Sequence, residues 1–125
     1  MWIFDSVFGK YKPTKINWVD ITNISQIDEI SNSDDAVLIF KHSTICRKSR
    51  RVLRKFQKRF DSYDIELKMY CLDLREYEYR DVSCELGVRF NVIHESPQVI
   101  IIKDGRAVIH DSQEKINKIN IKQYI

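Results

Sequence analysis

The 125-residue chain has few cysteines, and it lacks the patterns in which cysteines usually act in groups. Its three cysteines are an odd number, and they form no Cys-x-x-Cys pair and no cluster with histidines at zinc spacing. These absences argue against a disulfide framework and against a metal site. We expect neither a metal ion nor a bound cofactor.

Long hydrophobic runs are also missing. No apolar run approaches the ~20 residues that a helix needs to cross a bilayer, and the run Met1–Phe4 is cut by Asp5, which argues against a signal peptide. We therefore expect a cytoplasmic monomer without stable membrane insertion. Residues 1–15 are predicted to be a short segment that docks on a single domain over residues 16–125, because this length suits one core.

Acidic residues are absent between Arg47 and Arg59, where eight of thirteen residues are Lys or Arg. From Asp61 to Asp81 the balance reverses, so the net charge is only +3. The basic stretch is interpreted either as a solvated helix face or as a recognition surface for an anionic thiol or substrate. Contact with nucleic acid is the weakest alternative, because no nucleic-acid motif accompanies the charge, and no nucleic-acid partner is expected.

The stretch from Ala36 to Ser49 is the centre of the chain. The apolar run Ala36–Phe40 predicts a strand buried on both faces. Ser43 and Thr44 follow as candidate N-caps of a helix, which would place Cys46 in the first helical turn. The helix itself is indicated by residues that recur at spacings of mostly three and four: Ile45, Ser49, Val52, Leu53, Phe56 and Phe60.

A cysteine at the start of a helix has a chemical advantage. The free N–H groups and the helix dipole favour the thiolate, which is the nucleophilic form. Nearby cations act in the same direction, and four of them are candidate thiol-binding residues: Lys41, Arg47, Lys48 and Arg50. Ser49 lies three residues after Cys46, where a dithiol enzyme would carry its second cysteine. The plainer alternative is a small buried cysteine at a helix start.

The remaining elements predict an α/β protein with a central mixed sheet and helices on both faces, which is the thioredoxin-like fold. The first three strands are linked by helices and should run parallel, whereas the last two form a hairpin at Asp104-Gly105. The expected elements are a strand at 16–21, a helix around 24–30, a strand at 67–74, a helix at 78–86 ended by Gly87, strands at 99–102 and 107–109, and a final helix with Ile116, Ile119, Tyr124 and Ile125. Pro97 precedes the first hairpin strand, where a missing N–H is tolerated.

Several motifs occur together in the chain: Lys41-His42-Ser43-Thr44-x-Cys46-x-x-Ser49, Tyr70-x-Leu72-Asp73-Leu74, Val88-Arg89-Phe90-Asn91-Val92-x-His94-Glu95-Ser96-Pro97-Gln98 and Lys103-Asp104-Gly105. This combination resembles the YtxJ-type bacillithiol-system proteins, which are thioredoxin-like monothiol bacilliredoxins. The resemblance covers nearly all of the chain from about Ile16 onward. Arg47 and Lys48 depart from the smaller or more apolar residues expected between Cys46 and Ser49.

The resemblance implies that the protein removes bacillithiol from S-bacillithiolated proteins, with bacillithiol as thiol co-substrate. It implies that Cys46 is the nucleophile and that Ser49 occupies the missing resolving position. It also implies that Pro97 is a cis-proline facing Cys46, and that Ser96 offers backbone contact to the substrate. Two other functions stay open: a glutathione-type monothiol glutaredoxin and a non-catalytic binding module that keeps the fold.

Other candidate residues have two interpretations each. His42 could polarise the thiolate or be an ordinary hydrogen-bonded histidine. Cys71 lies within a predicted strand and is expected in the core, whereas Cys84 lies on a predicted helix, where a resolving role is possible. His94 could line the site or fix its own loop.

Overall fold

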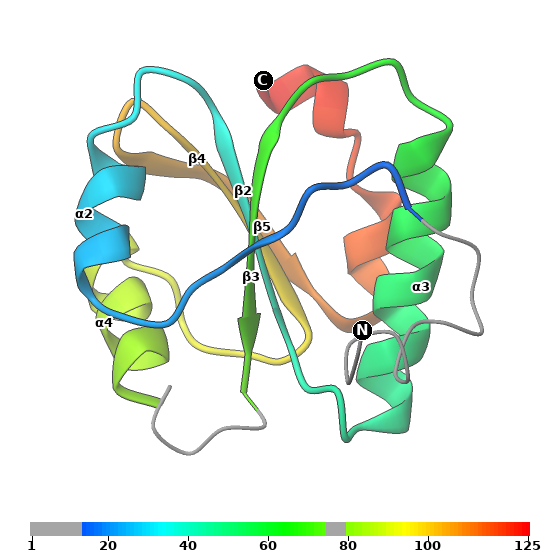
Figure 1. Ribbon diagram of the computed structural model, residues 1–125, viewed down its shortest axis with the longest axis horizontal. Coiled ribbons are helices and arrows are strands. Elements are labelled where there is room, and N and C mark those ends of the chain that lie inside the picture. The colour runs from blue at the N-terminus through cyan, green and yellow to red at the C-terminus, as the bar shows by residue number, and fades with distance from the viewer. Residues whose placement is uncertain (1–13, 75–79) are drawn as a thin grey trace.

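The computed structural model describes residues 14–74 and 80–125. A five-stranded sheet forms its centre, in the order β1-β3-β2-β4-β5 (Figure 1). The first three strands are parallel and β5 is antiparallel to β4, as predicted. The structure adds that β4 is antiparallel to β2. The strands are β1 (Val19–Asp20), β2 (Val37–His42), β3 (Lys68–Asp73), β4 (Gln98–Lys103) and β5 (Arg106–Ser112). The expected strand at 16–21 is thus reduced to two residues.

Helices cover both faces of the sheet (Figure 1). On one side lie α2 (Ser25–Ser31) and α4 (Arg80–Phe90), and on the other lies α3 (Arg47–Asp61). The C-terminal turns η2 (Gln113–Lys118) and η3 (Ile121–Tyr124) share the side of α3. The thioredoxin-like architecture is therefore confirmed, while the N-terminal segment predicted at 1–15 lies almost wholly outside the described residues.

Strand β2 separates two hydrophobic clusters. All six of its residues are buried, as expected for a central strand. Leu38 and Phe40 face the cluster under α3, whereas Val37 and Ile39 face the cluster under α2 and α4. Because successive side chains of a strand point to opposite faces, each residue of β2 belongs to one side of the sheet. This alternation decides which side chains can meet at the site.

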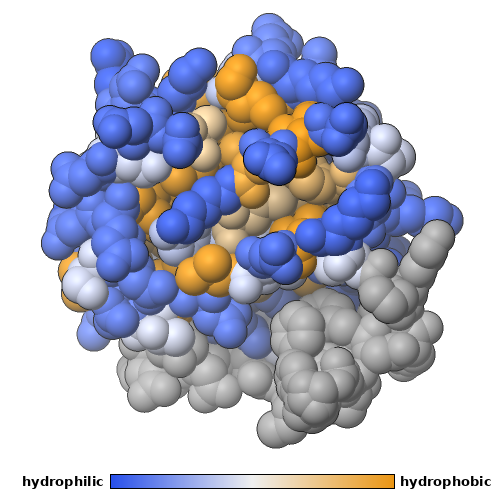
Figure 2. Space-filling view, turned by 45° about the horizontal axis from the view of Figure 1, so that its top comes forward, coloured by the Kyte–Doolittle hydropathy of each residue, from blue (hydrophilic) through white to orange (hydrophobic). Residues whose placement is uncertain are grey.

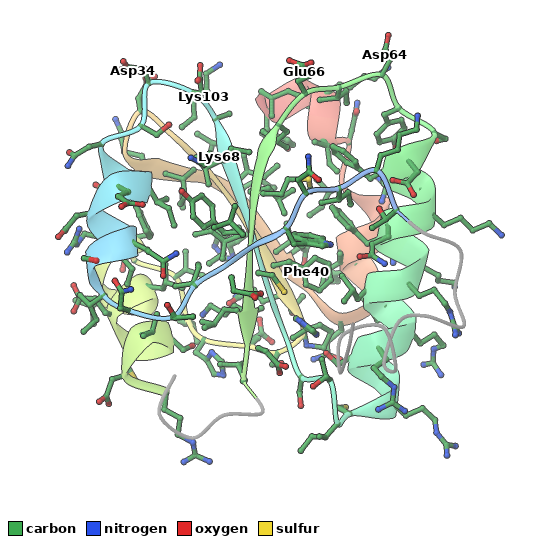
Figure 3. All side chains as sticks on the ribbon, viewed as in Figure 1. Asp34, Phe40, Asp64, Glu66, Lys68 and Lys103 are labelled. Atoms are coloured by element: carbon green, nitrogen blue, oxygen red, sulfur yellow. The ribbon has the colours of Figure 1, made fainter. Side chains whose placement is uncertain are left out.

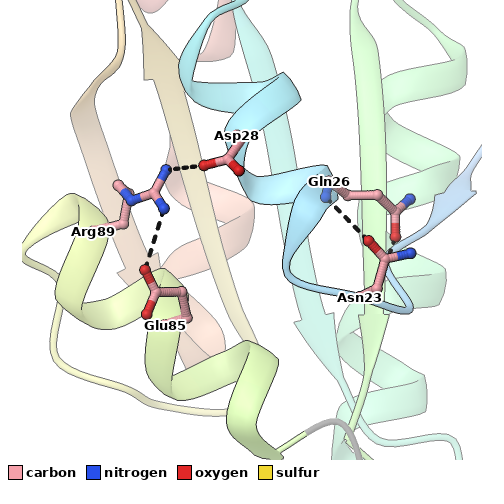
Figure 4. Close-up of polar contacts among 5 residues, drawn as sticks. All are labelled: Asn23, Gln26, Asp28, Glu85 and Arg89. Carbon is pink, nitrogen blue, oxygen red and sulfur yellow. Dashed lines mark hydrogen bonds and ion pairs between the residues drawn. The ribbon is translucent and has the colours of Figure 1, made fainter.

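Helices α2 and α4 are joined by the side chain of Arg89. Its guanidinium lies 2.8 Å from Asp28 of α2 and 3.3 Å from Glu85, one turn earlier on α4 (Figure 4). At the start of α2, Asn23 Oδ1 accepts a hydrogen bond from the backbone N–H of Gln26 (Figure 4). These exposed polar contacts orient the two short helices on the sheet.

Helix α4 does not end at Gly87, contrary to the prediction. It continues to Phe90, and Asn91 ends it with a left-handed backbone (φ 55°). The N–H of Val92 then folds back onto the carbonyl of Gly87 at 3.0 Å. A Cβ on Gly87 would lie 2.8 Å from the Val92 carbonyl oxygen, so glycine is needed for this close approach. The predicted start at Glu78 lies outside the described residues.

The C-terminal region agrees with the sequence at the hairpin but not beyond it. Asp104 and Gly105 both have positive φ, 54° and 74°, as a tight two-residue turn requires. The single final helix is replaced by the two short 3₁₀ turns η2 and η3. Ile116 and Ile121 are still buried under this segment, so its packing role is as expected.

One end of the molecule carries apolar surface inside a ring of hydrophilic side chains (Figure 2). Asp34, Glu66 and Lys103 lie at this end (Figure 3). A hollow of about 530 Å³ is lined there by Asp35, Ala36, Glu66, Leu67, Lys68 and Ile125. It lies where β2 and β3 begin, at the opposite end of these strands from Cys46. Within the part of the chain described here, no helix is long and apolar enough to cross a membrane.

Candidate active site

Cys46 lies where the chain passes from the end of β2 into α3. It is the N-cap residue of α3, with an extended backbone (φ −97°, ψ 120°), and its carbonyl accepts a hydrogen bond from the N–H of Arg50 at 3.0 Å. The predicted caps Ser43 and Thr44 lie further upstream, so the helix starts later than expected. The Cys46 thiol is exposed and therefore accessible to another disulfide.

The loop that carries Cys46 is held from two sides, which explains why Thr44 does not cap the helix. Thr44 donates its backbone N–H and its hydroxyl to the carboxylate of Asp73 at the end of β3, at 3.3 and 2.9 Å. Arg50 donates from α3 to the Thr44 carbonyl at 2.7 Å. The Cys46 N–H donates to the Ser43 carbonyl at 3.1 Å, which closes a tight turn. Thr44 thus supports the site by attaching its loop to β3, and Arg50 holds the same loop to α3.

Ser49 is part of the same scaffold. Its side chain is buried, with 1% exposure, and its hydroxyl oxygen accepts a hydrogen bond from the backbone N–H of Ser43 at 2.9 Å. A hydroxyl has no redox chemistry with a thiol, so Ser49 shapes the loop without resolving a disulfide at Cys46.

Positive charge surrounds the start of α3. Arg47 and Lys48 are exposed and directly follow Cys46, and the first turn of the helix contains no acidic residue. The helix dipole adds partial positive charge at the same place. Both favour the binding of an anionic group beside Cys46.

Pro97 lies beside the end of β2 from which the Cys46 loop departs. Lys41 of β2 pairs with Gln98 of β4, and Pro97 immediately precedes Gln98. The Ser96–Pro97 peptide bond is cis, as predicted. The position at the carboxyl end of parallel strands is where open α/β sheets build their sites.

Two glutamine side chains hold the loop before Pro97. Gln98 is fully buried and donates from Nε2 to the Ile93 carbonyl at 2.9 Å. Gln113 donates from Nε2 to the Ser96 carbonyl at 2.8 Å, and its backbone N–H donates to the Pro97 carbonyl at 3.1 Å. The Ser96 carbonyl is therefore already engaged within the chain.

The buried hydrogen bond of His42 agrees with the second of its two expected roles, that of an ordinary hydrogen-bonded histidine. His42 is buried, and its Nε2 lies 2.9 Å from Cys71 Sγ on the neighbouring strand. Burial, together with the carboxylates of Asp20 and Asp73, raises the pKa of the Cys71 thiol well above its usual range. Cys71 is thus a core residue, as expected, and stays a neutral thiol.

Lys41 is separated from the other three predicted thiol-binding cations. It is fully buried, and strand alternation places it with Val37 and Ile39 on the face of α4. Its Nζ lies 3.3 Å from His94 Nδ1, which also lies 3.0 Å from the hydroxyl of Ser83 on α4. Burial lowers the pKa of Lys41 to about 8, and burial together with the Lys41 charge lowers the pKa of His94. Lys41 therefore fixes the loop of His94 and is not part of the surface around Cys46.

Cys84 is exposed on α4, across the sheet from α3 (Figure 1). This placement offers no support for a resolving role. Three scaffold residues were missed from the sequence: Asp73, Gln113 and Ser83. Asp73 could have been suspected, because it ends a strand next to the Cys46 loop, whereas Gln113 and Ser83 are brought to the site only by the folded chain.

Comparison with known proteins agrees with this geometry. A solved protein described as a candidate oxidoreductase with a thioredoxin fold superposes with a TM-score of 0.71 at 26% identity, covering 85% of this chain and 91% of the other. The thioredoxin of Malassezia sympodialis gives 0.67 at 18% identity, covering 90% and 92%. The thioredoxin of Schistosoma mansoni gives 0.63 at 19% identity, covering 86% and 95%.

The two thioredoxins are too distant in sequence to indicate more than the fold. The family relationship comes from a family model described as monothiol bacilliredoxin BrxC, which matches residues 19–121. This match spans the Cys46 loop, Ser49 and Pro97, and it supports a thiol redox function. The chain belongs to the monothiol bacilliredoxin BrxC family.

Proposed function

We propose that the protein is a monothiol thiol–disulfide oxidoreductase that removes bacillithiol from protein mixed disulfides through Cys46. The observation that carries the proposal is an exposed thiol at the start of α3 with a serine, not a cysteine, three residues later. Family membership supports the redox class, and bacillithiol as the thiol is our proposal. A reducing cytoplasm would supply it in free form.

In the first step, the Cys46 thiolate attacks the bacillithiol sulfur of the mixed disulfide. The bond between that sulfur and the substrate cysteine breaks, and the substrate leaves as a thiolate that takes a proton from water. The bacillithiol is now joined to Cys46 by a new disulfide. The substrate cysteine has been reduced to a thiol, and Cys46 has been oxidised to the mixed disulfide, so the electrons balance.

In the second step, a free thiol must clear the adduct. Ser49 cannot form a disulfide, and Cys71 is buried with a protonated thiol. A second bacillithiol, as thiolate, attacks the bacillithiol sulfur on Cys46, which releases oxidised bacillithiol and regenerates the Cys46 thiolate. Turnover then depends on the concentration of free thiol.

The surroundings of Cys46 suit an anionic adduct. Bacillithiol carries carboxylates on its malate portion, and Arg47 and Lys48 are exposed cations that directly follow Cys46 in the chain. Thr44 and Arg50 hold the loop, and the Pro97 segment presents backbone beside it. These residues would position the mixed disulfide, while the chemistry takes place at the sulfur.

The deciding experiment compares the intact mass of the protein after incubation with oxidised bacillithiol and with oxidised glutathione. We expect a single bacillithiol adduct on Cys46, absent from a Cys46→Ser variant, and slower reaction with glutathione. Equal rates with both disulfides would favour the glutaredoxin-like alternative. No adduct, together with alkylation of Cys46 no faster than in the denatured chain, would favour a binding module and overturn the proposal.

A further inference from the structure

The outer face of α3 carries a continuous row of cations. Six exposed residues belong to it: Arg47, Lys48, Arg51, Arg54, Lys55 and Lys58. Their spacing of one, three or four residues keeps them on one side of the helix. The opposite side packs on the sheet through Val52, Leu53 and Phe56. We call these six residues the cationic row.

The cationic row is longer than a reaction at Cys46 alone requires. From Cys46 to Lys58 the helix rises roughly 18 Å, at about 1.5 Å per residue. Exposed charges are screened beyond about 8–10 Å at physiological salt. Arg47 and Lys48 can thus act on the sulfur or on a small adduct, whereas Lys55 and Lys58 cannot. Lys55 and Lys58 could contact only an anion that extends along the helix away from Cys46.

Helix stability does not explain the row either. Cations near a helix N-terminus oppose the dipole, and α3 has no acidic residue in its first turn. Glu114 lies 3.7 Å from Lys48 and 3.9 Å from Arg51, but these pairs are about half exposed and contribute little. Over residues 14–74 and 80–125, no carboxylate lies within ion-pair distance of Lys55 or Lys58.

We propose that the cationic row docks an acidic segment of the substrate protein, which lies along α3 with its modified cysteine at Cys46. This inference rests on the proposed function and names the class of substrate that it selects. A polypeptide fits better than a nucleic acid for two reasons. Ile45, next to Cys46, is 71% exposed and offers an apolar contact, and the aromatic residues of α3, Phe56 and Phe60, are buried and cannot stack on bases.

The test uses two peptides that differ only in charge. Each carries one bacillithiolated cysteine, followed by a segment that is acidic in one peptide and basic in the other. At low salt we expect the acidic peptide to be reduced about tenfold faster than the basic one, and high salt to remove the difference. Equal rates at low salt would overturn the docking proposal while leaving the proposed function intact.

A double variant locates the effect. Lys55→Glu with Lys58→Glu should abolish the preference for the acidic peptide, because it reverses charge far from the sulfur. Lys103→Glu with Arg106→Glu changes net charge equally at the turn between β4 and β5, on the other side of the molecule from α3 (Figure 3 labels Lys103), and should keep the preference. If the control loses the preference to the same extent, net charge alone is responsible and the row is not a docking surface.

Two further readouts separate the docking proposal from the proposed function. Alkylation of Cys46 by neutral iodoacetamide should be equal in wild type and in the Lys55/Lys58 variant, which shows that fold and thiol are intact. Binding of an acidic peptide without cysteine tests docking even if no peptide is reduced. If a single-stranded oligonucleotide instead binds the row and acidic peptides do not, the docking proposal is wrong.

Discussion

The hydroxyl oxygen of Ser49 accepts the backbone N–H of Ser43 at 2.9 Å, across the turn that carries Cys46. The residue at the position of a resolving thiol therefore sets the shape of the loop. Replacing Ser49 with alanine leaves the Ser43 N–H without this acceptor in a partly buried position. We expect the free energy of unfolding in urea to fall by about 1 kcal/mol.

The matched control is Ser62→Ala, at the other end of α3, where the hydroxyl donates to the Arg59 carbonyl in an exposed position that water can satisfy. It should change the stability by less than about 0.5 kcal/mol. If Ser49→Ala were as stable as wild type, the bond from Ser43 would not be holding the loop.

Ser49→Cys should convert the site into a dithiol site. A thiol one helical turn from Cys46 has a high effective concentration, so the adduct on Cys46 should be displaced internally. The expected product is a disulfide between Cys46 and the introduced cysteine, seen as a mass loss of the two hydrogens after treatment with oxidised bacillithiol. Persistence of a stable bacillithiol adduct in this variant would mean that the two sulfurs cannot meet.

The adduct on wild-type Cys46 should accumulate until free thiol is added. Cys71 is buried with a raised pKa, and Cys84 lies across the sheet on α4, so neither is expected to clear it. Cys71→Ser and Cys84→Ser should leave de-thiolation nearly unchanged when circular dichroism shows an intact fold. A folded Cys84→Ser protein that traps an adduct which wild type clears unaided would identify Cys84 as a resolving cysteine.

Thr44→Val should weaken the attachment of the Cys46 loop to β3. It removes the hydroxyl that donates to Asp73 at 2.9 Å while keeping a similar side-chain volume. We expect a loss of stability of about 1 kcal/mol or more, since the Asp73 carboxylate loses a donor, and slower reduction of mixed disulfides. Thr22→Val is the control, because the Thr22 hydroxyl is exposed and makes only long contacts of 3.4 Å with Gln26 and Asn23; it should change stability by less than about 0.5 kcal/mol and leave reduction unchanged.

Lys41 should give the protein a distinctive pH dependence. Its pKa is lowered from 10.5 to about 8 in the folded state. Between these values the unfolded chain holds a proton that the folded chain has lost, so stability should rise as pH increases from 8 to 10.5 and fall as pH decreases. At roughly 1.4 kcal/mol per pKa unit, the contribution is on the order of 3 kcal/mol.

The Lys41→Met variant removes this titration while keeping an unbranched buried side chain. The stability of wild type relative to Lys41→Met should therefore rise with pH across the same interval. The stability of Lys103→Met, which changes an exposed residue at the end of β4, should follow the same pH dependence as that of wild type. A constant difference between wild type and Lys41→Met would show that Lys41 titrates normally.

Much of the fold could be predicted from local patterns. The buried strand from the run Ala36–Phe40, the strand that contains Cys71 and the turn at Asp104-Gly105 each have a short-range physical cause, and all three appear as expected. Gly87 was misread because its usual role after a helix was assumed. The structure instead uses its missing Cβ to admit the Val92 carbonyl.

The site was predictable where it depends on chain order and not where it depends on tertiary contacts. Cys46 and Pro97 follow from their positions at strand ends. Lys41 was grouped with Arg47 because the two are close in sequence, although strand alternation sends Lys41 to the other face of the sheet. The hydrogen bond from Thr44 to Asp73 could not be predicted either, because the sequence does not show that the end of β3 lies beside the Cys46 loop.

The reversed charge at the start of α3 has a consequence for anyone who engineers this protein. Acidic residues are the usual choice in the first turn of a helix, so Arg47→Glu or Lys48→Glu is the change that a stability-guided redesign would select first. The same substitutions would repel the anion that the site is proposed to receive. Thermostable variants chosen by melting temperature alone should therefore include a class that is more stable and slower, and its members should cluster at these two positions.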